Sequence, residues 1–502
     1  MRKESGKRGG RQRPTTCERV TFGRIGSEMK IKISCGAMTA DMLASLCGGV
    51  LRDGRGAETQ VRAICTDSRE ADADTVFCAL RGDRVDGHDY IKNVLDAGCR
   101  CILCEQSNPF VEACGSAAIV VNDTELALAR LANAYRHSLN CRVVGVTGSV
   151  GKTTAKDMIS SVLGCAKRTY KTSGNHNSVI GLPLSVAEIP QDCEWAVLEM
   201  GMSGFGEIER LSIATEPDVA VITNIGTAHM EMLGSRENIC RAKLEILCGL
   251  KSGGTLILNG DEPLLQGIGG RSYRTVYVSL EREDCTYSAR NIRVENGYTL
   301  FDLVWGGGVE KDLRVNVMGR HNVYAAAYAF AVGILGGMKP EEIREGLLRF
   351  APEGLRQNRS ECREWTFLED CYNASPESMM AALEVLSEFC KQTGRRSVAI
   401  LGDMLELGVQ SATMHQRVGE RAAMLGINEL ITLGTRAKHI AVGAQRKGSP
   451  SVSSFDIPCR ETMDSIAREI ASKLQPGDVV LFKASRGVGE ERLIEALKNL
   501  KD

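Results

Sequence analysis

The stretch CRVVGVTGSVGKTTAKDMISSVL, residues 141–163, decides the fold of the chain. Residues 143–147 are a short apolar run rich in β-branched side chains, which predicts a buried strand. A glycine-rich turn follows at residues 148–151. After the turn, apolar residues recur at helical spacing: Met158, Ile159, Val162 and Leu163. Strand, turn and helix in this order predict a loop that binds the phosphates of a nucleotide.

Each part of this loop suits a triphosphate. The glycines let the backbone approach the anion, and the amides at the start of the helix point toward it. Lys152 is predicted to reach the outer phosphates, and the Thr153 hydroxyl to ligate a magnesium ion. Val146 stands where the full G-x-x-x-x-G-K-[ST] pattern has its first glycine, but the shorter form G-x-x-G-K-T-T is intact.

The bulk properties of the chain narrow the function classes. A length of 502 residues predicts several domains, and 62 basic against 63 acidic residues give no electrostatic case for nucleic acid. No apolar run approaches the ~20 residues that a membrane span needs. The 19 cysteines are predicted to be free thiols of a cytosolic protein. Cys101 and Cys104 form a C-x-x-C without a second pair, which favours core packing over a metal site.

The pattern of apolar residues divides the chain into four parts. Residues 1–37 begin basic and glycine-rich and are predicted to be a disordered tail, with a nucleic-acid-binding arm as the alternative. Residues 38–140 predict a small α/β domain. Residues 141–351 form the domain of the phosphate loop, with an antiparallel section at 261–317. Residues 352–502 alternate strictly between strand and helix, which predicts a doubly wound, Rossmann-like domain.

Polar side chains follow the predicted strands of the phosphate-loop domain. Glu199 ends one strand, and Asn224 and His229 follow another, so all three are expected at the edge that carries the loop. Glu199 suits a magnesium ion, whereas a lone histidine is more often a structural residue. Lys243 lies near the apolar seam of a predicted helix. From the residues alone, extension of its amine to solvent is favoured over a chemical role.

Two further groups of polar residues are candidates for ligand binding. Residues 66–69, Thr-Asp-Ser-Arg, follow a predicted strand and suit a diphosphate or a base edge, although a turn capped by the aspartate fits equally well. In the last domain the strand ends carry polar residues that predict a second substrate site and a closing motion: Asp370, Asn373, Asp403, Lys483, Ser485 and Arg486.

Taken in order, these motifs resemble the Mur ligase family, the ATP-dependent amide-forming enzymes of bacterial cell-wall precursor synthesis. The resemblance covers nearly all of the chain after the basic tail. It rests on residues 148–154, on TSGNHNSVIGLP at 172–183, on Glu199, on residues 226–229 with Lys243, on residues 320–322 and on DCYNASP at 370–376. It implies a uridine-binding first domain, a central parallel-sheet ATPase domain and a C-terminal ligase domain.

Within the family, the chain is most similar to members that add D-alanyl-D-alanine to UDP-N-acetylmuramoyl-tripeptide. The discriminating stretches are LGDMLELG at 401–408 and FKASRGVG at 482–489. Members that add the third amino acid would carry an Asp-Asn-Pro-Arg signature, and the last domain has none. The resemblance therefore implies these two substrates, ATP and Mg²⁺ as cofactors, and a cytoplasmic monomer without nucleic-acid or membrane partners.

The resemblance also implies roles for single residues. The ATP-binding residues would be Gly148, Ser149, Val150, Gly151, Lys152, Thr153, Thr154, Asn322 at the adenine, Arg356 and Asp370. The metal ligands would be Thr153, Glu199 and His229, and the catalytic residues Lys152, His229 and Lys243. Lys243 occupies the position that family members carbamoylate. The UDP-substrate would be bound by Ser68, Arg69, Asn175 and Asn177, and the dipeptide by Asp403, Lys483 and Arg486.

The family chemistry implies phosphorylation of a carboxylate by ATP, followed by attack of an amine on the acyl phosphate. Two alternatives of the same class stay open: a sister ligase with another amino-acid donor, and folylpolyglutamate synthase, against which the domain before the phosphate loop argues. An alternative from another class is a phosphate-loop switch that hydrolyses nucleotide without an amine acceptor.

Overall fold

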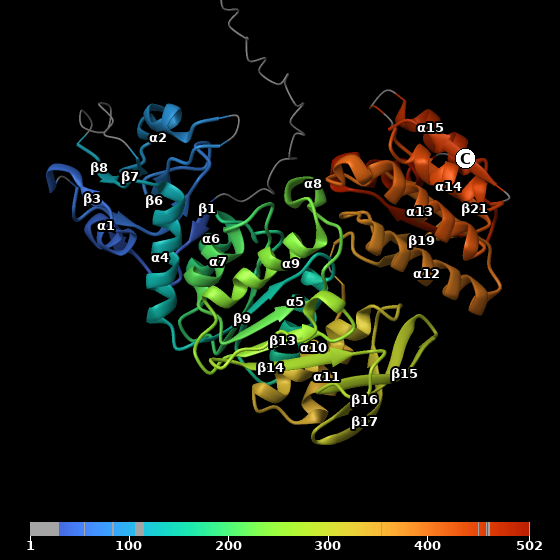
Figure 1. The fold of residues 1–502 in the computed structure, drawn as a ribbon. Helices are drawn as coiled ribbons and strands as arrows, with labels where there is room; N and C mark the ends of the chain where they lie inside the picture. The colour runs from blue at the N-terminus through green and yellow to red at the C-terminus, as the bar shows by residue number, and fades with distance from the viewer. Residues whose placement is uncertain are drawn as a thin grey trace, which may run out of the picture.

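The computed structural model describes residues 30–500 apart from positions 55, 83–84, 106–114, 353, 450, 458 and 460–461. Three large sheets follow one another along the chain with helices packed on them, which confirms the predicted three-part α/β fold (Figure 1). Most of the predicted tail, residues 1–29, lies outside the described residues. Its predicted end at 37 is wrong, because Lys30–Lys32 is a strand whose Ile31 is buried in the core of the first domain.

The N-terminal sheet has the strand order β1-β5-β6-β7-β8-β3, in which β5 to β8 run parallel and both edge strands antiparallel. Cys101 and Cys104 are buried in β7, as predicted. The strands are β1 Lys30–Lys32, β3 Val50–Leu51, β5 Ala63–Cys65, β6 Thr75–Cys78, β7 Cys101–Cys104 and β8 Ala117–Val120, with β2 Met38–Thr39 and β4 Gln60–Val61 as a separate pair. The helices are α1 Ala40–Cys47, α2 Ile91–Asp96 and α4 Thr124–Ser138.

The central sheet has nine strands in the order β10-β11-β9-β12-β13-β14-β15-β16-β17. They are β9 Arg142–Thr147, β10 Thr169–Lys171, β11 Trp195–Glu199, β12 Val219–Ile222, β13 Thr255–Asn259, β14 Arg274–Ser279, β15 Tyr287–Glu295, β16 Tyr298–Trp305 and β17 Gly308–Val315. The helices are α5 Lys152–Leu163, α6 Gly181–Ala187, α7 Glu207–Thr215, α8 Met230–Leu233, α9 Arg236–Leu244, α10 Asn322–Leu335 and α11 Pro340–Arg349. Only β15, β16 and β17 pair antiparallel, so the predicted antiparallel section begins later than expected.

Both faces of the central sheet are covered, which explains why its strands are continuously apolar. Val144 and Val146 pack on one face in a core with α5 and α10, and Val143 and Leu198 pack on the other face. The register aligns Glu199 with Val146, and Ile222 with Thr147. The carboxyl ends of β9, β11 and β12 therefore meet at one edge, where the residues that follow them form the site.

The C-terminal sheet has the order β18-β19-β23-β20-β21-β22, and all its pairs are parallel except β18 with β19. The strands are β18 Asn358–Cys362, β19 Trp365–Glu369, β20 Ser397–Gly402, β21 Glu429–Leu433, β22 Val452–Phe455 and β23 Val479–Lys483. The helices are α12 Pro376–Thr393, α13 Ser411–Met424, α14 Lys438–Arg446, α15 Met463–Ala471 and α16 Glu491–Lys498. Figure 1 shows this domain beside α8 of the central domain.

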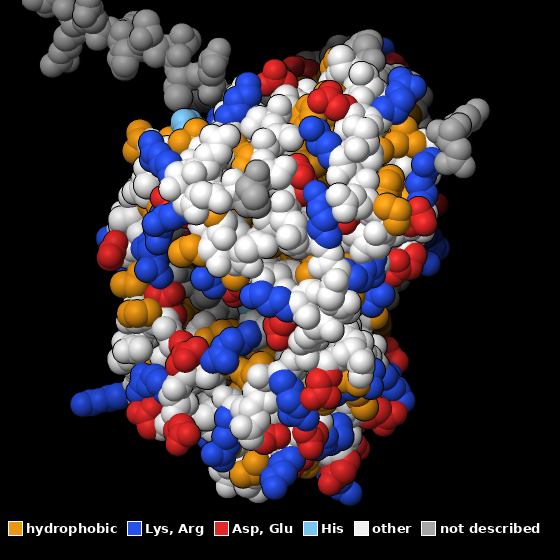
Figure 2. Space-filling view, turned by 90° about the vertical axis from the view of Figure 1, so that its right-hand side faces the viewer, with side chains coloured by type: hydrophobic (Ala, Val, Ile, Leu, Met, Phe, Trp, Pro, Cys, Tyr) orange, Lys and Arg blue, Asp and Glu red, His pale blue; other side chains and the backbone are white. Residues whose placement is uncertain are grey.

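Three further properties of the described chain concern its surface charge, its cysteines and the character of its helices. Acidic and basic side chains are interspersed over the face drawn in Figure 2. The seventeen cysteines in the described chain are all free thiols. Among the described residues, no helix has the length and apolar character that a membrane crossing requires.

Candidate active site

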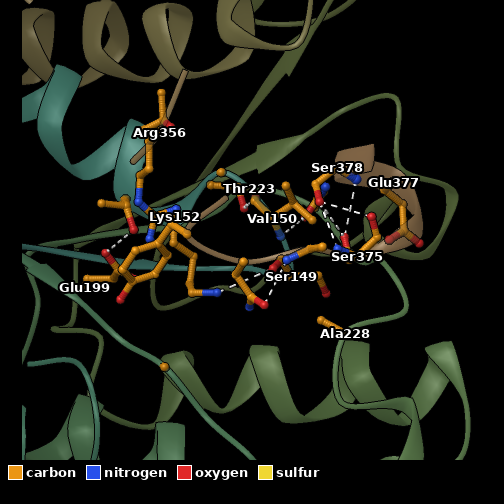
Figure 3. Close-up of a pocket in the computed structure, with 18 of the residues that line it drawn as sticks. Ser149, Val150, Lys152, Glu199, Thr223, Ala228, Arg356, Ser375, Glu377 and Ser378 are labelled. Carbon is orange, nitrogen blue, oxygen red and sulfur yellow. Dashed lines mark hydrogen bonds between the residues drawn. The ribbon is translucent and has the colours of Figure 1, made fainter. Parts of the chain in front are cut away.

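The phosphate loop connects β9 to α5 and is held by the end of the neighbouring strand β12. Gly148 has a φ of 143°, and a Cβ there would lie 1.9 Å from Thr223 Oγ1, so glycine is required. Thr223 Oγ1 donates to the Val150 carbonyl at 2.6 Å, and Asn224 Oδ1 accepts from the Val150 amide at 2.8 Å (Figure 3). The loop is thereby fixed by the side chains of the two residues that follow β12.

Lys152 and Ser149 supply the polar groups of this loop. Lys152 Nζ donates to the Gly148 carbonyl at 2.9 Å, so the side chain folds back over the loop. Burial lowers the pKa of Lys152, an effect that Glu199 partly offsets. Ser149 Oγ is buried and has no hydrogen-bond partner among the described residues. A cation and an unpartnered hydroxyl thus lie where a phosphate group is expected.

Of the three residues predicted to hold magnesium, Thr153 and Glu199 are in contact, and His229 contacts another residue. Thr153 Oγ1 donates to Glu199 Oε2 at 2.8 Å, and Asn177 Nδ2 donates to Glu199 Oε1 at 2.8 Å. His229 lines the same cavity, but its Nδ1 lies 2.8 Å from Glu406 Oε2 of the C-terminal domain. Three or more His, Cys, Asp or Glu side chains nowhere gather as a metal cluster in the described chain. The hydroxyl and carboxylate pair still fits Mg²⁺, which takes most of its oxygens from phosphates and water.

Lys243, on α9, does not extend to solvent, so that expectation is wrong. Its side chain is completely buried, and Nζ has no hydrogen-bond partner in the part of the chain that the structure describes. Burial places the pKa of Lys243 well below its ordinary value, and the charge of Lys152 lowers it further. The carboxylates of Glu199 and Glu207 are close enough to oppose this shift. A lowered pKa raises the fraction of the uncharged amine, which is the form that can react as a nucleophile.

The predicted nucleotide residues gather where the central and C-terminal domains meet. Asn322 begins α10 and is 2% exposed, and its Nδ2 donates to the Met318 carbonyl at 2.8 Å. The Arg356 guanidinium stacks 3.9 Å from the centre of the Tyr372 ring. Asp370 follows β19 and faces the same cavity. These residues come from both domains, so a nucleotide bound here would contact each of them.

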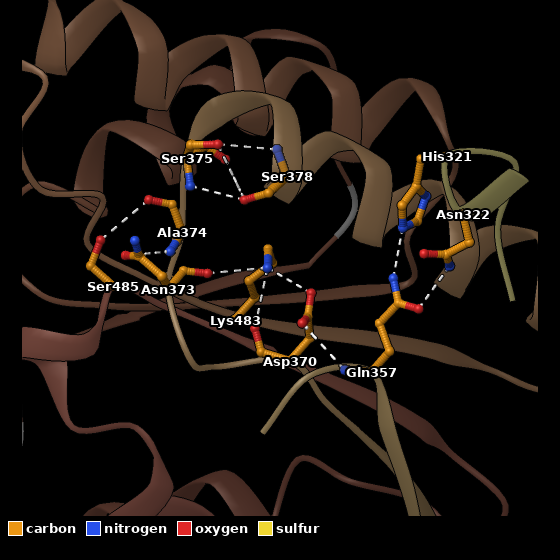
Figure 4. Close-up of polar contacts among 10 residues, drawn as sticks. All are labelled: His321, Asn322, Gln357, Asp370, Asn373, Ala374, Ser375, Ser378, Lys483 and Ser485. Atoms are coloured by element: carbon orange, nitrogen blue, oxygen red, sulfur yellow. Dashed lines mark hydrogen bonds and ion pairs between the residues drawn. The ribbon is translucent and has the colours of Figure 1, made fainter. Parts of the chain in front are cut away.

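Two of the three residues predicted to bind the dipeptide have other partners. Asp403 is 3% exposed, lies outside the cavity lining, and accepts from the Ala437 amide at 2.6 Å. Lys483 Nζ donates to Asp370 Oδ2 at 2.6 Å and to two backbone carbonyls at 3.2 Å, so its three donors are used (Figure 4). Both side chains are thus engaged within the protein, although Lys483 also lines the cavity. Arg486 lines the cavity beside Tyr372 and is the predicted cation that stays accessible.

The predicted UDP-substrate residues lie in two separate places. Asn175 and Asn177 line the cavity. Ser68 and Arg69 follow β5 in the N-terminal domain and are not part of its lining. Arg69 is held by Asp67, which accepts from the Arg69 backbone amide and Nε at 2.9 Å. The capped turn and the diphosphate interpretation of residues 66–69 are therefore compatible, because most of the Arg69 side chain is exposed.

A single cavity of about 1080 Å³ lies between the central and C-terminal domains. Its lining includes the phosphate loop, Glu199, Asn322 and Arg356. The lining residues that sequence reasoning did not name include three with polar contacts across the cavity: Gln357, Glu377 and Glu406. Thr227 Oγ1 donates to Glu377 Oε1 at 2.9 Å, and the other oxygen of Glu377 is buried without a partner among the described residues. Gln357 follows Arg356, Glu377 follows the stretch 370–376, and Glu406 lies within the stretch 401–408. Closeness to these motifs in the sequence could have indicated all three.

Family models place this architecture among known proteins. The Mur ligase middle domain matches residues 146–333, the Mur ligase, glutamate ligase domain matches 356–486, and the Mur ligase family, catalytic domain matches 60–136. The chain belongs to the Mur ligase family. The three matches cover each of the three domains of this Mur ligase, and the phosphate loop lies within the middle match.

Individual members of the family are similar over nearly the whole chain. The UDP-N-acetylmuramoyl-tripeptide–D-alanyl-D-alanine ligase of Bacillus subtilis is 39% identical over 460 residues, which are 91% of this chain and 98% of that protein. A crystal structure of MurF from Acinetobacter baumannii has a TM-score of 0.84 at 30% identity and covers 92% of this chain and 99% of its own. MurF ligase from Thermotoga maritima in complex with ADP has a TM-score of 0.77 at 29% identity, covering 87% and 96%.

Proposed function

We propose that this Mur ligase joins D-alanyl-D-alanine to UDP-N-acetylmuramoyl-tripeptide and converts ATP to ADP and phosphate, as a cytoplasmic step of peptidoglycan precursor synthesis. The observation that carries the proposal is the likeness, over nearly the full length of both chains, to a ligase of that name. The ADP complex of a similar structure supports ATP as the nucleotide. The absence of an Asp-Asn-Pro-Arg signature argues against addition of a third amino acid.

In this proposal, ATP lies in the cavity between the two larger domains. The loop of residues 148–154 binds its phosphates, and Lys152 leaves the Gly148 carbonyl to meet the terminal phosphate. Asn322 contacts adenine, and Arg356 and Asp370 contact the nucleotide from the C-terminal side. Arg486 binds the carboxylate of the incoming dipeptide, because a guanidinium matches a carboxylate with two parallel hydrogen bonds.

The chemistry activates a carboxylate, which is a poor electrophile in water. The terminal phosphoryl group moves to an oxygen of the tripeptide carboxylate, and ADP leaves. The dipeptide amine, after losing a proton, attacks the carbonyl carbon, and phosphate leaves with that oxygen. Lys152 neutralises charge on the transferred group. The C-terminal domain covers the cavity and limits the water that would hydrolyse the acyl phosphate.

Mg²⁺ fits Thr153 and Glu199, with His229 once it leaves Glu406, and would supply positive charge to the phosphate oxygens. Lys243 contributes through its buried amine, whose lowered pKa favours the uncharged form that can add to carbon dioxide with release of one proton. The resulting carbamate would be an anion at a place where Nζ has no partner among the residues that the structure describes.

The UDP-linked substrate extends from the N-terminal domain to the cavity. Ser68 and Arg69 bind the diphosphate, and Asn175 and Asn177 bind the muramoyl peptide near Glu199. This arrangement explains why the two groups of residues are apart: the nucleotide end and the reacting carboxylate are opposite ends of one long molecule.

The proposal is tested by measuring ADP release from purified full-length protein with ATP, Mg²⁺ and UDP-tripeptide. D-Alanyl-D-alanine should stimulate release strongly, and single amino acids should not. Equal release without any amine would favour a nucleotide switch, and preference for one amino acid would favour a sister ligase.

A further inference from the structure

Gln357 lies in the connection between α11, which ends at Arg349, and β18, which begins at Asn358. Its backbone is left-handed, with a φ of 50°, and its amide lies 3.3 Å from Asp370 Oδ1 as a hydrogen-bond donor. A left-handed glutamine is uncommon and needs support from its surroundings. The backbone is therefore anchored in the C-terminal domain, while the side chain reaches the start of α10 in the central domain (Figure 4).

Both ends of the Gln357 carboxamide contact residues of α10 or its cap. Oε1 accepts from Asn322 Nδ2 at 2.8 Å, and Nε2 lies 2.6 Å from His321 Nε2. The amide nitrogen can only donate, so His321 Nε2 accepts, and burial, which lowers the pKa of His321, favours the neutral ring that this contact needs. The orientation of the Gln357 amide is thus defined at both of its atoms.

This contact uses the last free donor of Asn322. One hydrogen of Nδ2 is given to the Met318 carbonyl, also at 2.8 Å, and the other to Gln357. Among the described residues, Asn322 Oδ1 makes no hydrogen bond, and Asn322 lines the cavity. The only group that Asn322 can offer a ligand is therefore an acceptor.

We propose that Gln357 is a specificity-determining positioning residue, which fixes the amide of Asn322 so that its oxygen selects adenine over guanine nucleotides. Adenine carries an exocyclic amino donor where guanine carries a carbonyl oxygen, so an acceptor favours adenine and repels guanine. A site built to meet a hydrogen-bonding group discriminates strongly against a base that lacks it. The inference rests on the proposed function, because it takes Asn322 as the contact to the base.

The test compares ADP and GDP affinities of the full-length protein by calorimetry, which needs no ligation. Gln357→Met has a similar length but cannot accept from Asn322, so the Asn322 amide keeps only the Met318 carbonyl as an acceptor and is held less firmly. The preference for ADP should fall about tenfold or more, the scale of one mismatched hydrogen bond. Gln357→Glu should keep the preference, because a carboxylate oxygen still accepts from Asn322 while His321 moves its proton to Nε2.

Two further variants separate orientation from general loosening. Gln392→Met removes another amide contact between the same domains, from Gln392 Nε2 to the Val294 carbonyl at 2.8 Å, and should leave the preference unchanged. Asn322→Ala should abolish most of the preference, and Gln357→Met should have no further effect on it in that background.

The inference is overturned if Gln357→Met keeps the wild-type preference, if Gln357→Glu or Gln392→Met lowers it equally, or if Gln357→Met still changes it in Asn322→Ala. A wild-type protein that prefers ADP but fails to join the dipeptide contradicts the proposed function alone. A wild-type protein that joins the dipeptide, with unchanged preference in Gln357→Met, contradicts this inference alone.

Discussion

His229 Nδ1 lies 2.8 Å from Glu406 Oε2, and this contact connects the central domain to the C-terminal domain. Both residues have left-handed backbones, with φ of 64° and 63°. The Glu231 amide also donates to the Glu406 carbonyl, at 3.2 Å. Close by, Thr227 Oγ1 donates to Glu377 Oε1. The loop after β12 is thus held by two glutamates of the C-terminal domain at the edge of the cavity.

Glu406→Ala is predicted to let the two domains separate more often when no ligand is bound. A single half-buried contact of this kind contributes about 1 kcal/mol, so the population of domain arrangements changes and the fold does not. Small-angle X-ray scattering should show a larger radius of gyration than for wild type. Glu469→Ala removes an exposed glutamate of α15 and is the control. An unchanged radius in Glu406→Ala would show that the contact does not hold the domains together.

Lys152→Ala is predicted to abolish ligation while leaving the fold intact. Removing a cation that neutralises a transferred phosphoryl group should lower kcat by about 10²–10³-fold or more. Because Nζ bonds, within the described part of the chain, only to the loop carbonyls of Gly148 and Ser149, circular dichroism and thermal unfolding should change little. Lys251→Ala, which removes an exposed partner of Asp218, is the matched control and should keep full activity. Near-normal turnover of Lys152→Ala at saturating ATP would contradict the assignment.

Lys243→Met is predicted to raise stability and to abolish activity. The variant replaces a fully buried amine that lacks a partner among the described residues by an apolar side chain of similar length. In buffer depleted of carbon dioxide, the free energy of unfolding should rise by about 1–3 kcal/mol. Labelled bicarbonate should give a carbamate carbon signal in wild type that is missing in the variant. A variant with lower stability and an unchanged spectrum would refute both the burial argument and the chemical role.

Glu490→Gln is predicted to stabilise the protein in a pH-dependent way. Glu490 is 3% exposed, and burial places the pKa of its carboxyl well above the ordinary 4.5. Above 4.5 the unfolded chain loses this proton while the folded chain keeps it, so the wild type loses stability as the pH rises. The variant should therefore be more stable at pH 7, by about 1–2 kcal/mol, and the difference should shrink toward pH 4.5. Urea unfolding at both pH values measures this, and a constant difference would contradict it.

Local patterns explain what could be predicted from the sequence. Gly148, Lys152 and Thr153 are adjacent in a strand–turn–helix segment, so their geometry follows from neighbours along the chain. Glu199 could be placed because parallel strands end at one edge of a sheet. The predicted antiparallel section was only partly correct, since alternation of apolar residues does not report whether β14 pairs parallel with β13.

Partners that are distant in the sequence explain what could not be predicted. Glu406 meets His229 only because two domains pack together, and no spacing encodes that contact. Asp403 and Lys483 stand at strand ends, as predicted, but their side chains bond to the Ala437 amide and to Asp370, which are distant in the sequence. The position of a residue at a strand end therefore predicted which edge of the sheet it lies at, but not which group its side chain contacts.

The central claim is that ATP activates a carboxyl group which then joins the nitrogen of a dipeptide. The most direct measurement is mass spectrometry of both products after reaction of UDP-tripeptide labelled with ¹⁸O in its terminal carboxyl group. The account predicts a UDP-pentapeptide and inorganic phosphate that carries one ¹⁸O atom. Phosphate without the label, or ADP formed while the tripeptide stays unextended in the presence of D-alanyl-D-alanine, would contradict it.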